Sequence, residues 1–272
     1  MGKIEFVKAV GTGNDFVIVD NRQDKLNSDI PDFSEFAKHI CRRKLSIGAD
    51  GLLVLEDSGS GDFKMRIFNP DGSEVAMCGN GARCAAVYAA SKGWCGGNAV
   101  IETGAGKIEA VISENRVKLK MSDPRDIVLS RDIGIGKNLI KTHSINTGVP
   151  HVVHFIKQME NYPVKEVGSK IRYHKLFQPE GTNVNFVKIT EDRRLIVRTY
   201  ERGVEDETNA CGTGSVASGI IAHLIHGISS PVDAMTASGD TLMIHFEEKN
   251  KRIVNVYLEG PANIVYEGNI TL

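Results

Sequence analysis

The chain has few of the features that would tie it to a membrane or to a nucleic acid. Its 272 residues carry a formal net charge of −1, so no excess of one sign attracts a polyanion or an anionic membrane. No apolar run approaches the length of a membrane span, and residues 1–6 lack the apolar core of a secretion signal. We therefore expect a cytoplasmic protein without a nucleic-acid or membrane partner.

Cysteine is also scarce, and its spacing argues against two common uses. The five cysteines are an odd number, they are spread along the chain, and they form no Cys-x-x-Cys pair. A disulfide-stabilised secreted fold and a structural zinc site are therefore not expected. We interpret Cys41, Cys84 and Cys95 as small hydrophobic side chains in a reducing environment.

The chain does contain one sequence pattern twice. Cys78 opens Cys-Gly-Asn-Gly, and Cys211 opens Cys-Gly-Thr-Gly 133 positions later (211 − 78). Other segments match at a similar offset, such as 48–51 with 181–184. Collinear matches at a near-constant offset indicate a duplicated domain, and the chain is long enough for two domains.

The sequence patterns of both halves predict the same elements around a buried helix. Apolar side chains cover most of the circumference of the helix after each cysteine, and each helix ends at a glycine, Gly93 or Gly227. An amphipathic helix is expected around 33–41, with a counterpart near 167–171. The expected strands are 16–19, 51–55, 63–68, 107–112 and 117–121 in the first half, and 152–156, 185–189, 195–200, 242–246 and 253–258 in the second.

These elements predict an α/β (α+β) fold of two pseudo-symmetric domains. Each domain is expected to be a curved mixed β-sheet or barrel that wraps around its central helix. The first domain would span 1–125 and carry Cys78, and the second would span 126–263 and carry Cys211. We expect the join between Pro124 and Lys141.

The two cysteines lie where a helix would activate them. A helix N-terminus exposes N–H groups and partial positive charge, which bind a carboxylate and lower a thiol pKa from about 8.5 towards neutrality. Two such units facing each other could hold one amino acid with a sulfur on each side of its α-carbon. One thiolate would remove the α-proton and the opposite thiol would return a proton to the other face, without a cofactor.

Two polar residues occupy matching strand ends just before the cysteine segments. Asn69 follows the strand expected at 63–68, and Glu201 follows the strand expected at 195–200. A polar residue at a strand end often only forms a turn. Because both copies keep a polar group, we expect both side chains to point toward the cysteine loops.

Several motifs of this chain together resemble the diaminopimelate epimerase family over nearly its whole length. They are Gly-Asn-Asp-Phe at 13–16, Arg-Ile-Phe-Asn-Pro-Asp-Gly-Ser-Glu at 66–74, Met-Cys-Gly-Asn-Gly-Ala-Arg-Cys at 77–84, Thr-Gly-Val-Pro-His at 147–151, Tyr-Glu-Arg-Gly at 200–203 and Ala-Cys-Gly-Thr-Gly at 210–214.

The resemblance implies an enzyme that interconverts LL- and meso-2,6-diaminopimelate on the route to lysine and the peptidoglycan precursor. It implies that no pyridoxal phosphate and no metal are used, and that this small amino-acid substrate lies between two pseudo-symmetric domains of a homodimer. The C-terminal strand, 264–272, would return to the first domain.

The resemblance also implies roles for individual residues. Cys78 and Cys211 would be the catalytic acid–base pair, and His151 and Glu201 would orient or assist at the reacting centre. Tyr266 matches a tyrosine of the dimer contact. The reacting carboxylate would be bound by Gly79, Asn80, Gly212 and Thr213, and the amino and distal groups by Asn14, Asn69, Asn183, Glu201 and Arg202. For His151, packing in a loop after Pro150 is the alternative.

The chain departs from the family pattern at three places. Val149 stands where many members have asparagine, and Gly51 where some have glutamine, so substrate hydrogen bonds there would be missing or water-mediated. The segment between Glu201 and Cys211 is one residue longer than usual. Its acids, Glu205, Asp206 and Glu207, are expected to face solvent.

Alternative functions stay open. A proline racemase-like enzyme of the same fold is the nearest one, although such enzymes resemble Cys-Gly-His-Gly where this chain has Cys-Gly-Asn-Gly. A PhzF-like isomerase fits less well because that group lacks the cysteine pair. The alternative from another class is a thiol redox switch or amino-acid sensor, in which the two cysteines form a reversible disulfide.

Overall fold

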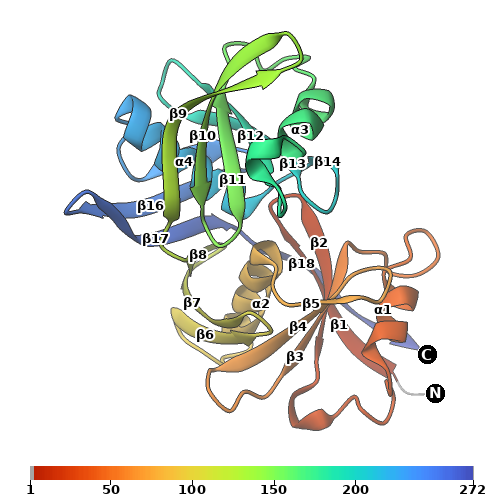
Figure 1. The fold of residues 1–272 in the computed structure, drawn as a ribbon. Helices are drawn as coiled ribbons and strands as arrows, with labels where there is room; N and C mark the ends of the chain where they lie inside the picture. Colours follow the sequence, from red (N-terminus) through yellow and green to blue (C-terminus); the bar gives the residue numbers. More distant parts are fainter. Residues whose placement is uncertain (1–2, 272) are drawn as a thin grey trace. The chain divides into compact units, whose positions relative to one another are not determined.

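The computed structural model describes residues 3–271, which form two compact units (Figure 1). Unit 1 comprises the described residues up to Leu119 and from Gly260 onward, and unit 2 comprises Lys120–Glu259. The chain passes from unit 1 to unit 2 at 119/120, a few residues before the expected boundary at 125/126. The C-terminal strand is part of unit 1.

Unit 1 is built on strands in the spatial order β18–β1–β2–β3–β4–β6–β7–β8. Neighbouring strands are antiparallel except for the parallel pairs β2–β3 and β4–β6. The short β5 adds to β4. The elements are β1 (Lys3–Gly11), β2 (Asn14–Asp20), η1 (Arg22–Asp24), α1 (Phe33–Ile40), β3 (Gly51–Glu56), β4 (Phe63–Phe68), β5 (Glu74–Val75), α2 (Gly79–Ser91), β6 (Asn98–Thr103), β7 (Gly106–Ser113), β8 (Arg116–Lys120) and β18 (Asn263–Thr271).

Unit 2 repeats this arrangement in the order β9–β10–β11–β12–β13–β15–β16–β17. Its parallel pairs, β11–β12 and β13–β15, occupy the same places in the order, and the short β14 adds to β13. The elements are β9 (Arg125–Ile135), β10 (Asn138–Asn146), β11 (Pro150–Phe155), α3 (Val164–Arg172), η2 (Lys175–Phe177), β12 (Asn183–Ile189), β13 (Leu195–Glu201), β14 (Asp206–Thr208), α4 (Gly212–His226), β15 (Val232–Met235), β16 (Thr241–Lys249) and β17 (Arg252–Pro261).

The C-terminal strand completes the repeat in unit 1. β18 pairs with β1 in unit 1 just as β9 pairs with β10 in unit 2. The strand at this position therefore comes from the end of the chain in unit 1 and from the local hairpin in unit 2.

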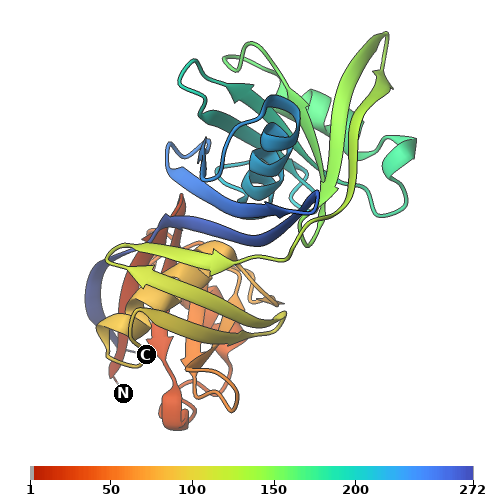
Figure 2. The same ribbon diagram turned by 90° about the vertical axis from the view of Figure 1, so that its left-hand side faces the viewer.

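Each sheet wraps around the helix that follows a cysteine (Figure 2). In unit 1, α2 packs against strands from β1 to β7 and against β18, and in unit 2, α4 packs against strands from β10 to β16. Helices α1 and α3 contribute to separate apolar clusters on the other face of their sheets. Because both faces are covered, β3 and most of β12 are continuous buried runs. The predicted fold class is confirmed.

The observed elements confirm most of the predicted ones and correct one. Every predicted strand overlaps an observed strand, and α1 and α3 occupy the predicted amphipathic segments. The expected join between Pro124 and Lys141 is wrong, because β9 and β10 form an antiparallel hairpin there. Gly136, at a φ of 62°, closes the turn. β9 escaped the sequence analysis because most of its side chains are exposed, so it has no apolar pattern.

Candidate active site

Each repeated cysteine is the N-cap residue of a central helix. Cys78 precedes α2 at a φ of −143°, and Cys211 precedes α4 at a φ of −124°, both in extended conformation. Each thiol therefore stands at the positive end of a helix dipole, beside the first N–H groups of the helix.

In unit 1 the side chain next to the cysteine turn is held by its neighbours. The Asn80 amide nitrogen donates to the Asn14 Oδ1 at 2.7 Å and to the Thr12 carbonyl at 3.3 Å. Its Oδ1 accepts from the buried Arg83 guanidinium at 2.6 Å. The Asn80 side chain is thus engaged within unit 1, which leaves mainly backbone N–H groups of this turn to receive a carboxylate.

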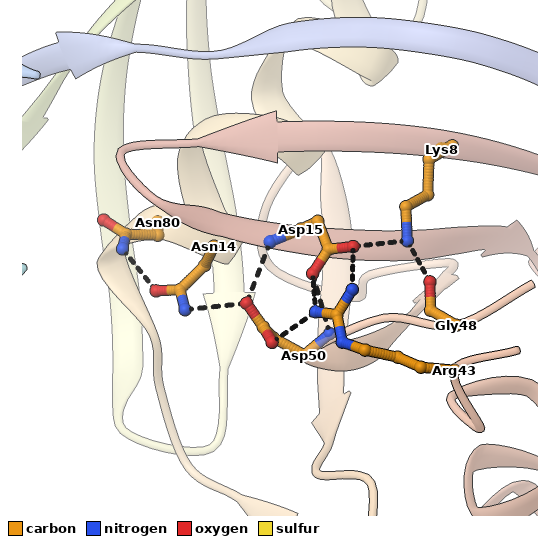
Figure 3. A network of polar contacts seen from close by, with 7 residues as sticks. All are labelled: Lys8, Asn14, Asp15, Arg43, Gly48, Asp50 and Asn80. Atoms are coloured by element: carbon orange, nitrogen blue, oxygen red, sulfur yellow. Dashed lines mark hydrogen bonds and ion pairs between the residues drawn. The ribbon is translucent and has the colours of Figure 1, made fainter. Parts of the chain in front are cut away.

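A charged network continues from Asn14 away from the helix (Figure 3). Asn14 Nδ2 donates to Asp50 at 3.1 Å, and Arg43 binds Asp50 at 2.7 Å and Asp15 at 2.6 Å. Lys8, on β1, binds Asp15 at 2.7 Å. Burial by itself would raise the pKa of Asp15, but hydrogen bonds from Arg43 and Lys8 outweigh it and lower the pKa to about 2. Three charged pairs thereby fix the orientation of Asn14.

The other expected residues of unit 1 have local contacts. The side-chain amide of Asn69 donates to Ser73 Oγ at 2.9 Å, and its backbone N–H donates to the Ser73 carbonyl at 2.9 Å. Asn69 therefore forms a turn in this structure, which is the alternative that its strand-end position allowed. Tyr266 lies on β18, is 46% exposed and packs edge-on against Phe6.

In unit 2 the thiol of Cys211 is buried. Burial raises the pKa of Cys211 to about 11, and the charge of Glu201 acts in the same direction. Hydrogen bonds from the Thr213 hydroxyl and from the N–H groups of Thr213 and Gly214 lower this pKa, but they do not outweigh burial. The expected near-neutral thiol is therefore wrong for Cys211, because removal from water has more effect than the helix terminus.

Three of the expected ligand-binding residues come together at one edge of the unit 2 sheet, and one of them, Glu201, lies near Cys211. Asn183 begins β12 and Glu201 ends its antiparallel neighbour β13, so both lie at one edge of the sheet. Asn183 Oδ1 accepts a hydrogen bond from the backbone N–H of Arg202 at 2.8 Å. Burial raises the pKa of Glu201, although a hydrogen bond from Thr208 at 3.0 Å opposes this rise. The charge of Glu201 also acts on the nearby cysteine, Cys211.

The three acids that follow Glu201 do not simply face solvent. Each is partly exposed and forms an ion pair with a base of unit 2, and β14 joins this segment to the sheet. The expectation of purely solvated acids is therefore wrong, because bases on α3 and β13 lie within reach. The pairs are Arg172–Glu205 at 3.3 Å, Lys165–Asp206 at 2.6 Å and Arg198–Glu207 at 2.6 Å.

His151 is buried and neutral. The residue is 1% exposed, and burial, with a contribution from the charge of Arg202, lowers the pKa of its imidazole to about 3. Nδ1 lies 3.1 Å from the amide nitrogen of Asn185. Nε2 has no hydrogen-bond partner among the described residues. A buried polar atom without a partner is uncommon and points to a ligand or to function.

Sequence reasoning missed two polar residues that support this site. Thr199 Oγ1 donates to Asn185 Oδ1 at 2.9 Å, and Asn185 Nδ2 also donates to the Val152 carbonyl at 3.1 Å. A Cβ at Gly214 would collide with Asn185 Oδ1, so Asn185 lies directly under the first turn of α4. A polar residue inside the apolar stretch 184–187 was the signal that could have found it.

The pairing register shows which residues of the two units correspond. Phe16 on β2 pairs with Gly51 on β3, and His151 on β11 pairs with Asn183 on β12. Because the sequence segments 12–17 and 147–152 match Phe16 to His151, Gly51 corresponds to Asn183, one residue away from the match of 48–51 with 181–184. A one-residue slip changes the face on which every side chain lies, so the register is the safer guide.

Known proteins share the sequence of this chain over nearly its whole length. The family model described as diaminopimelate epimerase matches residues 6–127 and 143–265. The chain is 42% identical over 275 residues to a diaminopimelate epimerase of Hydrogenobaculum sp. (strain Y04AAS1), covering 97% of each chain. The chain belongs to the diaminopimelate epimerase family. A family member of Chlorobaculum tepidum is also 42% identical, over 266 residues, covering 96% of this chain and 99% of the other.

Solved structures share the fold of this family at low identity. A PhzF-family phenazine biosynthesis protein of Bacillus anthracis matches with a TM-score of 0.72 and 16% identity, covering 100% of both chains. A probable proline racemase of Agrobacterium radiobacter K84 matches with a TM-score of 0.66 and 16% identity, covering 99% of this chain and 93% of that one. Within residues 3–271, no helix has the length and apolar character needed to cross a bilayer.

Proposed function

We propose that this chain is a diaminopimelate epimerase, an isomerase that converts LL-2,6-diaminopimelate into meso-2,6-diaminopimelate in lysine biosynthesis. Membership of the family over nearly the whole chain is the observation that carries this proposal. The two cysteines, each at the N-terminus of a buried helix, supply the chemistry that an α-carbon inversion needs.

The proton transfers are assigned to Cys78 and Cys211. Cys211 is protonated in the ligand-free protein, because burial raises its pKa to about 11. For one direction of the reaction, the Cys78 thiolate takes the α-proton, and the Cys211 S–H gives its proton to the opposite face of the resulting carbanion. Cys78 is then the thiol and Cys211 the thiolate, so the reverse direction uses the two groups in exchanged roles.

The helix termini and their neighbours hold the substrate. The first N–H groups of α2 and α4, at Gly79, Asn80, Gly212 and Thr213, bind the α-carboxylate and stabilise the negative charge that develops when the α-proton leaves. Asn14, Asn183, Glu201 and Arg202 are proposed to bind the amino and distal groups. For Asn69, whose amide is bound to Ser73, this role requires the turn to open.

The assembly and location are part of the same proposal. We place the protein in the cytoplasm, because the reaction needs two reduced thiols and none of the five cysteines, all within the described residues, forms a disulfide. A homodimer through β18 is supported by the exposed Tyr266 and Val265 on that strand. Light scattering of the purified protein tests it, and a monomer at all concentrations rejects the dimer.

The activity is tested with purified protein under dithiothreitol. LL-diaminopimelate and L-proline are supplied separately, and the stereoisomers are separated by chiral chromatography over time. We expect meso-diaminopimelate from the first and no D-proline from the second. Racemisation of proline alone would establish the racemase alternative, and no turnover of either amino acid by the reduced protein would favour the redox switch or sensor.

A further inference from the structure

Unit 2 has a row of buried polar side chains where unit 1 has an apolar row. We call His151, Asn185 and Thr199, on β11, β12 and β13, the polar row. By the pairing register its counterparts in unit 1 are Phe16, Leu53 and Ile67. Both rows are at most 3% exposed. An apolar row is thus compatible with this backbone, and packing alone does not require the polar one.

Asn185 lies under the cysteine turn of unit 2, and its apolar counterpart, Leu53, lies at the same position in unit 1. A Cβ at Gly81, in α2, would lie 3.1 Å from Leu53, as a Cβ at Gly214 would meet Asn185. Asn185 is therefore in contact with the turn that carries Cys211, and it is hydrogen-bonded to His151.

The bonds of Asn185 determine which nitrogen of His151 carries the proton. The Val152 carbonyl can only accept, so the NH₂ end of the Asn185 amide faces β11 and its oxygen faces Thr199. The same NH₂ group faces His151 Nδ1, which must then be the acceptor. The proton of the neutral ring is consequently on Nε2, the buried atom that lacks a partner among the described residues.

We propose that Asn185 is a positioning residue that holds His151 as the Nε2–H tautomer, so that Nε2–H donates a hydrogen bond to a carboxylate oxygen of the amino-acid substrate. This inference rests on the proposed function for the identity of the ligand. In this arrangement His151 donates a hydrogen bond and removes no proton. The two thiols carry out both proton transfers. Thr199 holds the amide oxygen of Asn185 and so supports the orientation indirectly.

Nitrogen NMR of the full-length protein tests the tautomer without any substrate. The ¹⁵N–¹H correlations of His151 are identified by their loss in His151→Gln. We expect a neutral ring at pH 7 with its proton on Nε2, and in Asn185→Asp, whose carboxylate can only accept from the ring, a proton on Nδ1. A His151 with its proton on Nδ1, or with two protons, in the unaltered protein would overturn the proposal.

Kinetics separate positioning from structural support. Asn185→Asp keeps the shape of the side chain but reverses its hydrogen bond to the ring. We expect kcat to fall about 10- to 100-fold, the size of loss known for residues that orient a metal-bound histidine. Thr199→Val leaves the Val152 carbonyl to orient the amide. It should keep the Nε2–H tautomer and retain kcat within about threefold. An equal loss in both variants, with the tautomer unchanged, would show a merely structural role and overturn the proposal.

The two readouts distinguish failure of this inference from failure of the proposed function. If the unaltered protein does not epimerise diaminopimelate, the carboxylate assignment falls with the proposed function, whereas the NMR result still decides whether Asn185 sets the tautomer. If the protein epimerises diaminopimelate but Asn185→Asp keeps full kcat, only the present inference is rejected.

Discussion

The two units build the same cysteine turn on different supports. In unit 1 the turn is followed by Asn80, which connects through Asn14 to the ion pairs of Asp15 and Asp50. In unit 2 the first turn of the helix rests on Asn185 and the uncharged polar row. The repeat therefore preserves the backbone and the position of the thiol, and it leaves each thiol in surroundings of its own.

This difference suits a reaction that treats the two faces of one carbon in opposite ways. An acid and a base need different protonation states, and such states come from different neighbours. Cys211 has a half-buried carboxylate, Glu201, near it and a raised pKa. The corresponding strand end in unit 1 carries Asn69, an uncharged residue that forms a turn. The two cysteine turns thus have different neighbouring residues, and this difference gives two equivalent thiols unequal roles.

The largest effect is expected from removing either thiol. Cys78→Ala and Cys211→Ala should each lower kcat by about 10³-fold or more, because each transfer has its own group and neither thiol can replace the other. Turnover is followed by chiral chromatography, with circular dichroism to verify that the variants fold. A near-normal rate in either variant would show that the two units do not divide the proton transfers.

The polar and apolar rows can be exchanged to test which one serves chemistry. Giving unit 2 the apolar row of unit 1 removes three buried polar groups and should leave the free energy of unfolding unchanged or raise it by up to about 2 kcal/mol. The same variant should lose about 100-fold or more in kcat. The substitutions are His151→Phe, Asn185→Leu and Thr199→Ile.

The reverse exchange in unit 1 is the matched control. It buries three polar groups in an apolar site and should cost about 4 kcal/mol in the free energy of unfolding measured with urea. Its substitutions are Phe16→His, Leu53→Asn and Ile67→Thr. If the unit 2 exchange proved the more destabilising of the two, the polar row would be needed for folding and the comparison would fail.

The charged support of unit 1 should be sensitive to Lys8. Lys8 is 7% exposed, and Lys8→Met should lower the free energy of unfolding at pH 7 by about 2 kcal/mol, since Asp15 keeps Arg43 as a partner. A carboxyl with a lowered pKa stabilises the fold above its unfolded pKa, and this stabilisation is lost as the pH falls. The difference between the two proteins should therefore shrink as the pH falls from about 4 towards 2.

Lys64→Met provides the control for this measurement. Lys64 forms an ion pair with Glu56 at 3.1 Å, but its side chain is 38% exposed. Its loss should change the free energy of unfolding by less than about 1 kcal/mol. Equal losses in the two variants would mean that the unit 1 network is an ordinary surface ion-pair cluster.

The smallest effect concerns the charge beside Cys211. Glu201→Gln removes a negative charge that raises the pKa of Cys211, so the pKa should fall and more thiolate should be present. At pH 9, alkylation of Cys211 by iodoacetamide, followed by peptide mass spectrometry, should become roughly two- to fivefold faster. Glu166→Gln, which changes an exposed acid on α3, is the control. An unchanged alkylation rate in Glu201→Gln would show that the charge of Glu201 does not raise the pKa of the Cys211 thiol.

The sequence predicted those parts of the molecule whose causes are local. The central helices could be found because residues such as Ile220 and Ile221 make them apolar on most sides, and the cysteines could be placed because their motifs precede these helices. The support networks could not be predicted, since Lys8 reaches Asp15 and Gly48 only once β1, β2 and the turn before β3 are assembled. The pKa of Cys211 depends on burial by the whole unit, and the motif alone favoured the opposite direction.

Deuterium incorporation tests the central claim, that one thiol from each unit acts on opposite faces of the α-carbon, most directly. LL-diaminopimelate is incubated with the reduced enzyme in deuterated water, and both stereoisomers are analysed by mass spectrometry before a tenth of the substrate has reacted. The account predicts that meso-diaminopimelate carries one deuterium from the donor thiol, while the remaining LL isomer stays unlabelled. Unlabelled product, or deuterium entering the LL isomer as fast as product forms, would contradict it.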